Sequence, residues 1–379
     1  MAVYRFEQIA INSTEKKKPT EADRLTYLGL EHLDSGCLNV SRFGSEVAPI
    51  GEKLVMRKGD VLFGKRRAYQ KKVAIAPFDG IFSAHGMVLR PNEAVIDKDF
   101  FPLFISSDYF LDAAIAISVG SLSPTINWRD LKDLEFNLPP LEEQKRLSKV
   151  FWAAENAIES YKNLIKSTDE LVKSQFIEMF GALLQDPKQC SCIEKICAVF
   201  NDGDWIESKD QSDSGIRLIQ TGNVGNGVYI DKGERARYIS QDTFERLHCT
   251  EVKPRDILIS RLPDPVGRAC IVPEGLGKTI TAVDCSIVRL CENVLPEFFV
   301  AFTLTPLYAG QVVSGITGST RQRISRKNLG KIVIPLPPME LQEQFAAFVR
   351  QSDKSKFELE QSLAELTATY KRIISENLG

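Results

Sequence analysis

Positively charged side chains gather in three stretches of the sequence, and their types suit contact with nucleic acid. The first stretch, residues 65–72, contains Lys65, Arg66, Arg67, Tyr69, Gln70, Lys71 and Lys72. The second contributes Arg261 and Arg268, and the third, residues 319–323, contains Ser319, Thr320, Arg321, Gln322 and Arg323. Lysine and arginine neutralise phosphates, whereas arginine and glutamine can form paired hydrogen bonds with base edges. A single basic loop is usually a solvated surface, so the hypothesis depends on whether these loops recur in an ordered way.

The second half of the chain repeats the first at a spacing of 198 residues. Gly120 matches Gly318, and the LPP of residues 138–140 matches that of residues 336–338. Further upstream the spacing drifts by a few residues, as insertions in loops between shared strands produce. With this drift the first basic stretch corresponds to the second, and at the spacing of 198 a segment with Ser123 and Thr125 corresponds to the third. The recurrence favours two DNA-recognition modules, with Ser123 and Thr125 among the expected contacts.

The sequence offers no convincing catalytic or metal site, so we expect no catalytic residue and no metal ligand. Residues 273–279 (PEGLGKT) lack the first glycine of a phosphate-binding loop, and residues 222–227 (GNVGNG) have glycines in the wrong order for a dinucleotide-binding turn. Cys190, Cys192 and Cys197 cluster without a nearby histidine, which favours reduced thiols over zinc.

The composition is that of a folded protein without a membrane segment. Of 379 residues 43% are hydrophobic, enough for the cores of two or three domains. No run reaches the roughly 18 apolar residues of a membrane helix, and the first residues lack a signal-peptide core. We therefore expect a cytoplasmic protein that does not bind a membrane. The net charge of −2 does not exclude nucleic acid, because local clusters decide binding.

Each half ends in a long helical segment with an apolar seam. In both segments apolar residues alternate spacings of three and four, the pattern of a coiled coil. The expected helix-pairing residues are Leu147, Phe151, Ile158, Ile165 and Val172 in the first segment and Phe345, Val349, Leu359, Leu366 and Ile373 in the second. Ser352 and Lys356 weaken the second seam, and Val150, Ala157, Leu164 and Leu171 form an additional stripe on the first helix. The alternative, two separate core helices, is disfavoured by a length of about 60 Å.

The fold class expected from these patterns is α+β, built by tandem duplication. Each repeat is a mixed α/β domain followed by a long helix, and the two helices pair as an antiparallel coiled coil with pseudo-two-fold symmetry. Short strands are expected near residues 60–64, 72–77 and 86–91, a helix over residues 97–118, and helix caps at Asn127 and Ser325. The expected divisions are domains 1–138 and 182–336 and helices 139–181 and 337–379.

Two ordered stretches resemble the specificity subunits of Type I restriction–modification systems. They are residues 120–147, GSLSPTINWRDLKDLEFNLPPLEEQKRL, and residues 318–345, GSTRQRISRKNLGKIVIPLPPMELQEQF. In that family such stretches join each target-recognition domain to its conserved helix. Residues 220–227 (QTGNVGNG) and 253–260 (KPRDILIS) also resemble recognition-domain segments.

The resemblance implies a non-catalytic subunit that reads an asymmetric, bipartite target on double-stranded DNA. It also implies that the helices set the spacer between half-sites and dock two methyltransferase subunits, which restriction and translocase subunits join. S-adenosylmethionine would be bound by the methyltransferases, so no cofactor is expected in this chain. One alternative is a coiled-coil adaptor that binds only proteins. Another, a complete enzyme, conflicts with the missing cofactor and nucleophile motifs.

Overall fold

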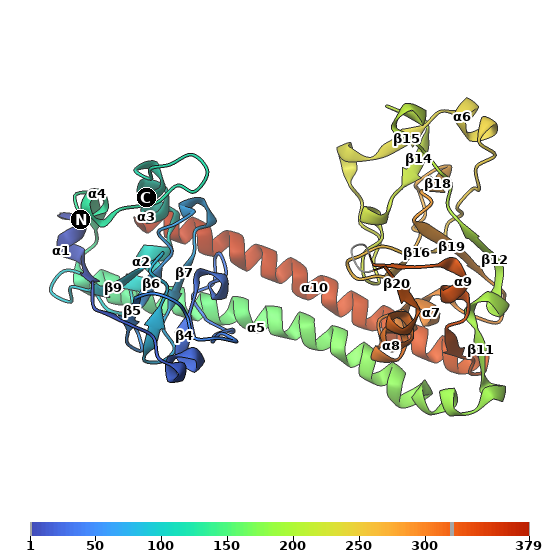
Figure 1. Cartoon of the computed structure of the whole chain (residues 1–379), viewed down its shortest axis with the longest axis horizontal. Coiled ribbons are helices and arrows are strands. Elements are labelled where there is room, and N and C mark those ends of the chain that lie inside the picture. Colours follow the sequence, from blue (N-terminus) through green and yellow to red (C-terminus); the bar gives the residue numbers. More distant parts are fainter. Residues whose placement is uncertain (1, 319–321, 379) are drawn as a thin grey trace. The chain divides into compact units, whose positions relative to one another are not determined.

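The computed structural model describes residues 2–318 and 322–378, and the chain divides into two compact units. Unit 1 comprises Met1–Lys162 with Gln361–Gly379, and unit 2 comprises Asn163–Glu360. Each unit holds one globular region and parts of both long helices, α5 (Leu141–Phe180) and α10 (Met339–Leu378) (Figure 1). The four-part division expected from the sequence follows chain order, whereas each compact unit draws helix segments from both repeats.

The globular region of unit 1 contains two four-stranded sheets. The first is antiparallel, in the order β2 (Ala10–Ser13), β9 (Met87–Pro91), β6 (Val61–Phe63) and β7 (Val73–Ile75). The second has the order β3 (Lys16–Lys17), β5 (Lys53–Met56), β8 (Gly80–Phe82) and β4 (Tyr27–Leu28), and its last two strands are parallel. A ribbon pairs β1 (Ala2–Arg5) with β10 (Glu135–Leu138). The three strands expected near residues 60, 72 and 86 are confirmed as β6, β7 and β9.

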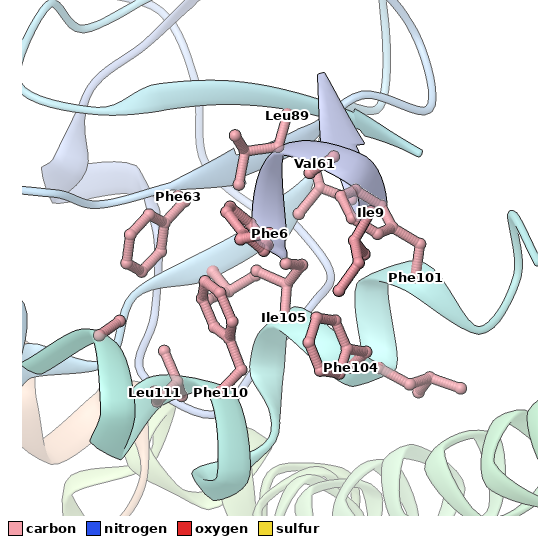
Figure 2. Packing of buried hydrophobic residues seen from close by; sticks show 14 of the residues in the cluster. Phe6, Ile9, Val61, Phe63, Leu89, Phe101, Phe104, Ile105, Phe110 and Leu111 are labelled. Atoms are coloured by element: carbon pink, nitrogen blue, oxygen red, sulfur yellow. The ribbon is translucent and has the colours of Figure 1, made fainter. Parts of the chain in front are cut away.

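Short helices pack on the first sheet of unit 1 through a cluster of aromatic rings. The helices are α1 (Phe6–Ile9), α2 (Phe101–Ser106), α3 (Asp108–Ala116) and α4 (Trp128–Leu131). The ring centroids of Phe6 and Phe110 are 5.0 Å apart, and those of Phe104 and Phe136 are 5.2 Å apart. Figure 2 shows Phe6, Phe63 and Phe110 between the strands and the helices. This core holds β6 and β7 rigidly, and the loop between them carries the first basic stretch.

The helix expected over residues 97–118 is wrong in one respect, because it is two helices, α2 and α3. Ser107 separates them with an extended backbone, and its Oγ accepts a hydrogen bond from the Phe110 amide at 3.3 Å. Thr305 caps the equivalent helix of the second repeat in the same way, accepting from the Tyr308 amide at 3.3 Å. Of the two caps expected from the sequence, Ser325 accepts from the Asn328 amide at 3.1 Å, whereas the side chain of Asn127 makes no such bond.

Unit 2 contains the corresponding strands and helices. Its first sheet has the order β12 (Cys197–Asp202), β19 (Cys285–Leu290), β16 (Ile257–Ser260) and β17 (Ala269–Ile271), and its second β13 (Gln211–Ser212), β15 (Arg237–Ile239), β14 (Ile216–Ile219) and β18 (Thr279–Thr281). Two ribbons pair β11 (Cys190–Cys192) with β22 (Val333–Pro335) and β20 (Ile316–Thr317) with β21 (Arg323–Ile324). The helices are α6 (Gln241–Arg246), α7 (Pro296–Thr303), α8 (Pro306–Gly315) and α9 (Arg326–Gly330).

The duplication is close in the first sheet and looser in the second. The orders β2-β9-β6-β7 and β12-β19-β16-β17 are equivalent strand for strand. In the second sheet, strands matched in chain order (β3 with β13, β4 with β14, β5 with β15 and β8 with β18) do not occupy the same places. In unit 1 β8 lies between β5 and β4, whereas in unit 2 β14 lies between β15 and β18. The first sheet is therefore the shared scaffold, and the second is where the repeats have diverged.

A buried ion pair recurs in the shared sheet. Asp60 accepts two hydrogen bonds from Arg90 at 2.7 and 2.9 Å, and Asp256 accepts two from Arg289 at 2.8 and 2.7 Å. These hydrogen bonds raise the pKa of both arginines. Since paired donors satisfy a buried carboxylate, each pair fixes the start of a central strand.

The repeated LPP segments contain a buried glutamine that ties each long helix to its domain. Gln144 accepts from the Asp97 amide at 2.8 Å and donates to the carbonyls of Val95 and Pro139 at 3.1 and 2.9 Å. Gln342 repeats this, accepting from the Leu295 amide at 3.0 Å and donating to two carbonyls, each at 3.0 Å. The repeated motif therefore anchors each long helix to the globular region that precedes it.

The two long helices contact each other within each unit, and they run antiparallel. In unit 1 the ring centroids of Phe151 and Tyr370 are 5.8 Å apart. In unit 2 those of Phe176 and Phe345 are 5.4 Å apart, and Lys356 Nζ lies 2.7 Å from Asp169 Oδ1. Partners later in α5 thus meet residues earlier in α10. Lys356, which weakens the apolar seam of α10, therefore forms an ion pair with Asp169 of α5.

The expected helix-pairing residues are buried or half-buried throughout. Leu147, Phe151, Ile158, Val172 and Phe345 are buried, and the other five are half-buried. The second stripe behaves differently, because Val150, Leu164 and Leu171 are 42, 53 and 52% exposed. The stripe is an apolar surface on α5 that faces solvent.

None of the described helices alone has the length and apolar character of a membrane span. Helices α7 and α8 reach these criteria together, across a bend of 70°.

Candidate nucleic-acid interface

In each unit the loop that follows the central strand lies against the loop that precedes the short helix. In unit 1 the Ile126 amide donates to Lys65 O at 2.9 Å, and the Arg67 amide donates to Pro124 O at 2.8 Å. In unit 2 the Ile324 amide donates to Arg261 O at 3.2 Å, the equivalent contact. The expected DNA-binding stretches therefore come together twice, at equivalent places on the shared sheet.

The unit 1 loops carry a group of positive charges, and among the described residues no carboxylate forms an ion pair with Lys65, Arg66 or Arg67. Arg66 and Arg67 are exposed, Lys65 is half-buried, and Arg66 Nη1 lies 3.4 Å from His85 Nε2. Burial and then Lys16 lower the pKa of Lys65. Burial and then the charges of Arg66, Lys65 and Lys53 lower the pKa of His85. We call Lys16, Lys53, Lys65, Arg66, Arg67 and His85 the unit 1 basic cluster.

Three members of this cluster are not expected from the sequence. Lys16 is on β3, Lys53 is on β5, and His85 precedes β9. They lie far apart in the chain, and strand pairing brings them together. The only sequence signal is the run of lysines at residues 16–18, which has no periodic pattern to assign it to an interface.

Two lysines of the first basic stretch are held by protein groups. Lys71 Nζ donates to Asp108 Oδ1 at 2.6 Å and to Asp112 Oδ1 at 2.7 Å. Desolvation lowers the pKa of Lys71, but these two bonds outweigh it and raise the pKa. Lys72 Nζ donates to Leu30 O at 2.6 Å. Both lysines therefore anchor the loop, whereas Tyr69 is 56% exposed and Gln70 is half-buried.

The unit 2 arginines of the second stretch are also occupied. Arg268 donates to the carbonyls of Val224, Leu262, Pro265 and Thr221 at 2.6 to 3.0 Å. Arg261 is 5% exposed, donates to Val283 O and lies 3.4 Å from Asp202. Burial lowers the pKa of Arg261. Protein carbonyls and a carboxylate thus already hold these two side chains, and the expected contact of their guanidinium groups with DNA stays a prediction.

The third stretch is partly described. Ser319, Thr320 and Arg321 lie outside the described residues. Gln322 is exposed, and Arg323 Nη2 lies 3.1 Å from Asp284 Oδ1. Nearby, Arg326 Nε lies 3.6 Å from Asp202 Oδ2, and its Nη1 donates to Phe200 O at 2.7 Å. Asp284 and Asp202 thus offset Arg323 and Arg326 of unit 2, whereas in unit 1 aspartates pair with Lys71.

The smaller polar residues of unit 1 shape their loop. Thr125 Oγ1 donates to Ser123 O at 3.1 Å, and the Thr125 amide donates to Val119 O at 2.9 Å. Both residues are half-buried. They hold a short loop, residues 119–125, beside Arg66 and Arg67.

The chemistry of the thiols is unremarkable for catalysis. All eight cysteines are free, and burial raises the pKa of Cys197 to about 12. Within residues 2–318 and 322–378 no group of three or more His, Cys, Asp or Glu side chains could hold a metal ion.

Comparison with known proteins agrees with this architecture. The family described as "Type I restriction modification DNA specificity domain" matches residues 26–167 and 186–368, one match in each repeat. The chain therefore belongs to the family of Type I restriction–modification specificity subunits, which are not catalytic and recognise the target within the complex.

Individual relatives are distant in sequence. The chain is 27% identical over 182 residues to the Type I restriction enzyme EcoDI specificity subunit of Escherichia coli, a match covering 46% of this chain and 40% of that one. It is 22% identical over 333 residues to the EcoKI specificity subunit of Escherichia coli K12, covering 83 and 70%. A solved chain from a study of complex assembly and conformational transition of the type I R-M system has a TM-score of 0.61 and 20% identity. That match covers 99% of this chain and 97% of the solved one, and it supports the fold.

Proposed function

We propose that this chain reads an asymmetric, two-part target on double-stranded DNA, one half with each unit. The observation that carries the proposal is the repeated loop pairing, in which Ile126 bonds Lys65 and Ile324 bonds Arg261. A duplicated scaffold that presents unlike loops at equivalent places suits two different half-sites. Phosphate contacts would position each unit, and base contacts would specify the sequence.

The contacts differ in kind between residues. In unit 1 the proposed DNA contacts are Lys65, Arg66, Arg67, Tyr69, Gln70, Ser123 and Thr125. In unit 2 they are Gln322 and Arg323 together with Ser319, Thr320 and Arg321. Arg261, Arg268, Lys71 and Lys72 instead position the loops, since each already donates at least one hydrogen bond to a protein oxygen.

Two methyltransferase subunits are the proposed partners of the long helices, and restriction and translocase subunits would join through them. The exposed side chains of Val150, Leu164 and Leu171 support this, because apolar surface on a helix favours burial against a protein. S-adenosylmethionine would be bound by the methyltransferases and not by this chain. The complex would act in the cytoplasm, where its DNA lies.

The decisive experiment is co-expression with the methyltransferase subunit, followed by mapping of methylated adenines in host DNA. We expect one two-part motif with a fixed spacer. Alanine at both Arg321 and Arg323 should relax recognition in one half. Methylation without sequence preference would contradict the proposal.

The alternative is a coiled-coil adaptor without DNA binding, favoured by the same exposed stripe. Serine at both Leu164 and Leu171 should reduce copurification of the methyltransferase under either hypothesis, and Lys166→Ser, also exposed on α5, is the matched control. A complex that assembles but shows no difference in affinity between duplexes of any sequence would favour the adaptor.

A further inference from the structure

An exposed leucine lies on the loop that packs against the Arg66–Arg67 segment of the unit 1 basic cluster. Leu122, at the tip of the 119–125 loop, is 92% exposed, and Val119 in the same loop is 65% exposed. The Arg66 and Thr125 backbones form an isolated bridge, so this loop borders the exposed guanidinium groups. Single exposed apolar residues are common on protein surfaces and need no explanation by themselves. This one lies on a loop whose backbone is hydrogen-bonded to the segment that carries Arg66 and Arg67.

The loop that carries Leu122 is held at both ends. The Val119 amide donates to Thr125 O at 3.0 Å, and the Thr125 amide donates back to Val119 O at 2.9 Å. The amides of Arg67 and Ala68 both donate to Pro124 O, at 2.8 and 3.3 Å. Gly120 has a φ of 113°, a conformation that allows the tight turn. Little ordering of the loop is therefore needed for Leu122 to make a contact.

The partner of such a surface must combine negative charge with an exposed apolar group. Duplex DNA does so in the major groove, where phosphates flank the C5-methyl group of thymine. Insertion of a leucine between bases is the competing mode, but it costs a few kcal/mol of unstacking. The thymine methyl is exposed before binding, so contact with it has no such cost.

We infer that Leu122 contacts the C5-methyl group of a thymine in the half-site read by unit 1. The inference rests on the proposed function and assigns to one residue a role in specificity. If the proposed methyltransferase partners modify an adenine in the half-site read by unit 1, the thymine paired with it supplies such a methyl group.

The test is a double-mutant cycle on the complex with its methyltransferase subunits. Each thymine of the mapped target is replaced in turn by deoxyuridine, which removes only the methyl group. In the wild type one replacement should weaken binding about fourfold, the value of roughly one buried methyl group. In Leu122→Ala that same replacement should have no further effect. Arg66→Ala is the control, and it should retain the fourfold response while binding with a weaker salt dependence.

The outcomes separate this inference from the proposed function. Equal binding of all duplexes by the wild type would refute the proposed function itself. Target recognition in which no deoxyuridine replacement depends on Leu122 would overturn this inference alone. Loss of the methyltransferase from Leu122→Ala, with an intact deoxyuridine response, would show that the leucine serves a protein partner and would also overturn it.

Discussion

Alanine at both Arg66 and Arg67 should reduce the salt dependence of DNA binding by a calculable amount. Both side chains are exposed, and Arg66 has the neighbouring ring of His85, not a carboxylate, at 3.4 Å. If each guanidinium contacts one phosphate, the double variant releases two fewer counterion equivalents. The slope of log K against log salt then becomes shallower by about 1.8. Between about 50 and 200 mM salt the variant should lose about 12-fold less affinity than the wild type loses.

The assay is fluorescence anisotropy of a labelled target duplex, titrated with the complete methyltransferase complex at several salt concentrations. Lys71→Ala is the matched control, because its ammonium lies 2.6 and 2.7 Å from two carboxylates and is already neutralised. It lies in the same loop and carries the same formal charge. We expect its slope to match that of the wild type. Equal slopes for the double variant and the wild type would refute the reasoning, and so would an equal change in Lys71→Ala.

Three further predictions concern pH, stability and target geometry. Burial and neighbouring cations lower the pKa of His85, so its ring gains a proton only in acid. DNA affinity should therefore rise as pH falls in the wild type but not in His85→Gln. The unfolded chain takes up that proton at a higher pH than the folded chain, so acid should cost the wild type some stability, as denaturant titration would show. Gln144→Ala should destabilise the protein by about 2–3 kcal/mol, because buried amide and carbonyl groups lose their partners, whereas Glu142→Ala, at an exposed position of the same helix, should leave stability nearly unchanged. One heptad added to each long helix should lengthen the mapped spacer by at most about three base pairs, since seven residues extend a helix by about 10 Å; an unchanged spacer would refute a ruler function for the helices.

Local patterns predicted the scaffold well, because the residues that build it repeat and have clear periodicity. The alternating apolar positions of α5 and α10 identified side chains that are buried or half-buried, and the strands β6, β7 and β9 were evident from β-branched runs. The helix over residues 97–118 was overextended, because a strong apolar face concealed the cap at Ser107. The apolar pattern predicts helix, but it does not show where one helix ends and the next begins. That boundary depends on the hydroxyl of Ser107 and its backbone geometry.

The availability of charges could not be predicted in the same way. A sequence does not show that Lys71 meets two carboxylates from α3 or that Arg268 is held by four carbonyls. Nor does it show that Lys16 and His85 join Arg66 at one surface. These outcomes depend on contacts between residues distant in the chain, and local composition does not encode them.

The two units would therefore differ in how much they contribute to general attraction for phosphates and how much to recognition of bases. On the proposed function, the exposed Arg66 and Arg67 of the unit 1 basic cluster would contact phosphates, and counterion release would supply affinity for any sequence. In unit 2 Asp284 lies 3.1 Å from Arg323 and Asp202 lies 3.6 Å from Arg326, so the approach of a phosphate would also bring it near carboxylates. Weaker general attraction leaves neutral donors such as Gln322 to contribute through base edges, which specify sequence. The shared first sheet keeps the loops in equivalent places in both units, and on the proposed function their different charges would change the source of binding energy.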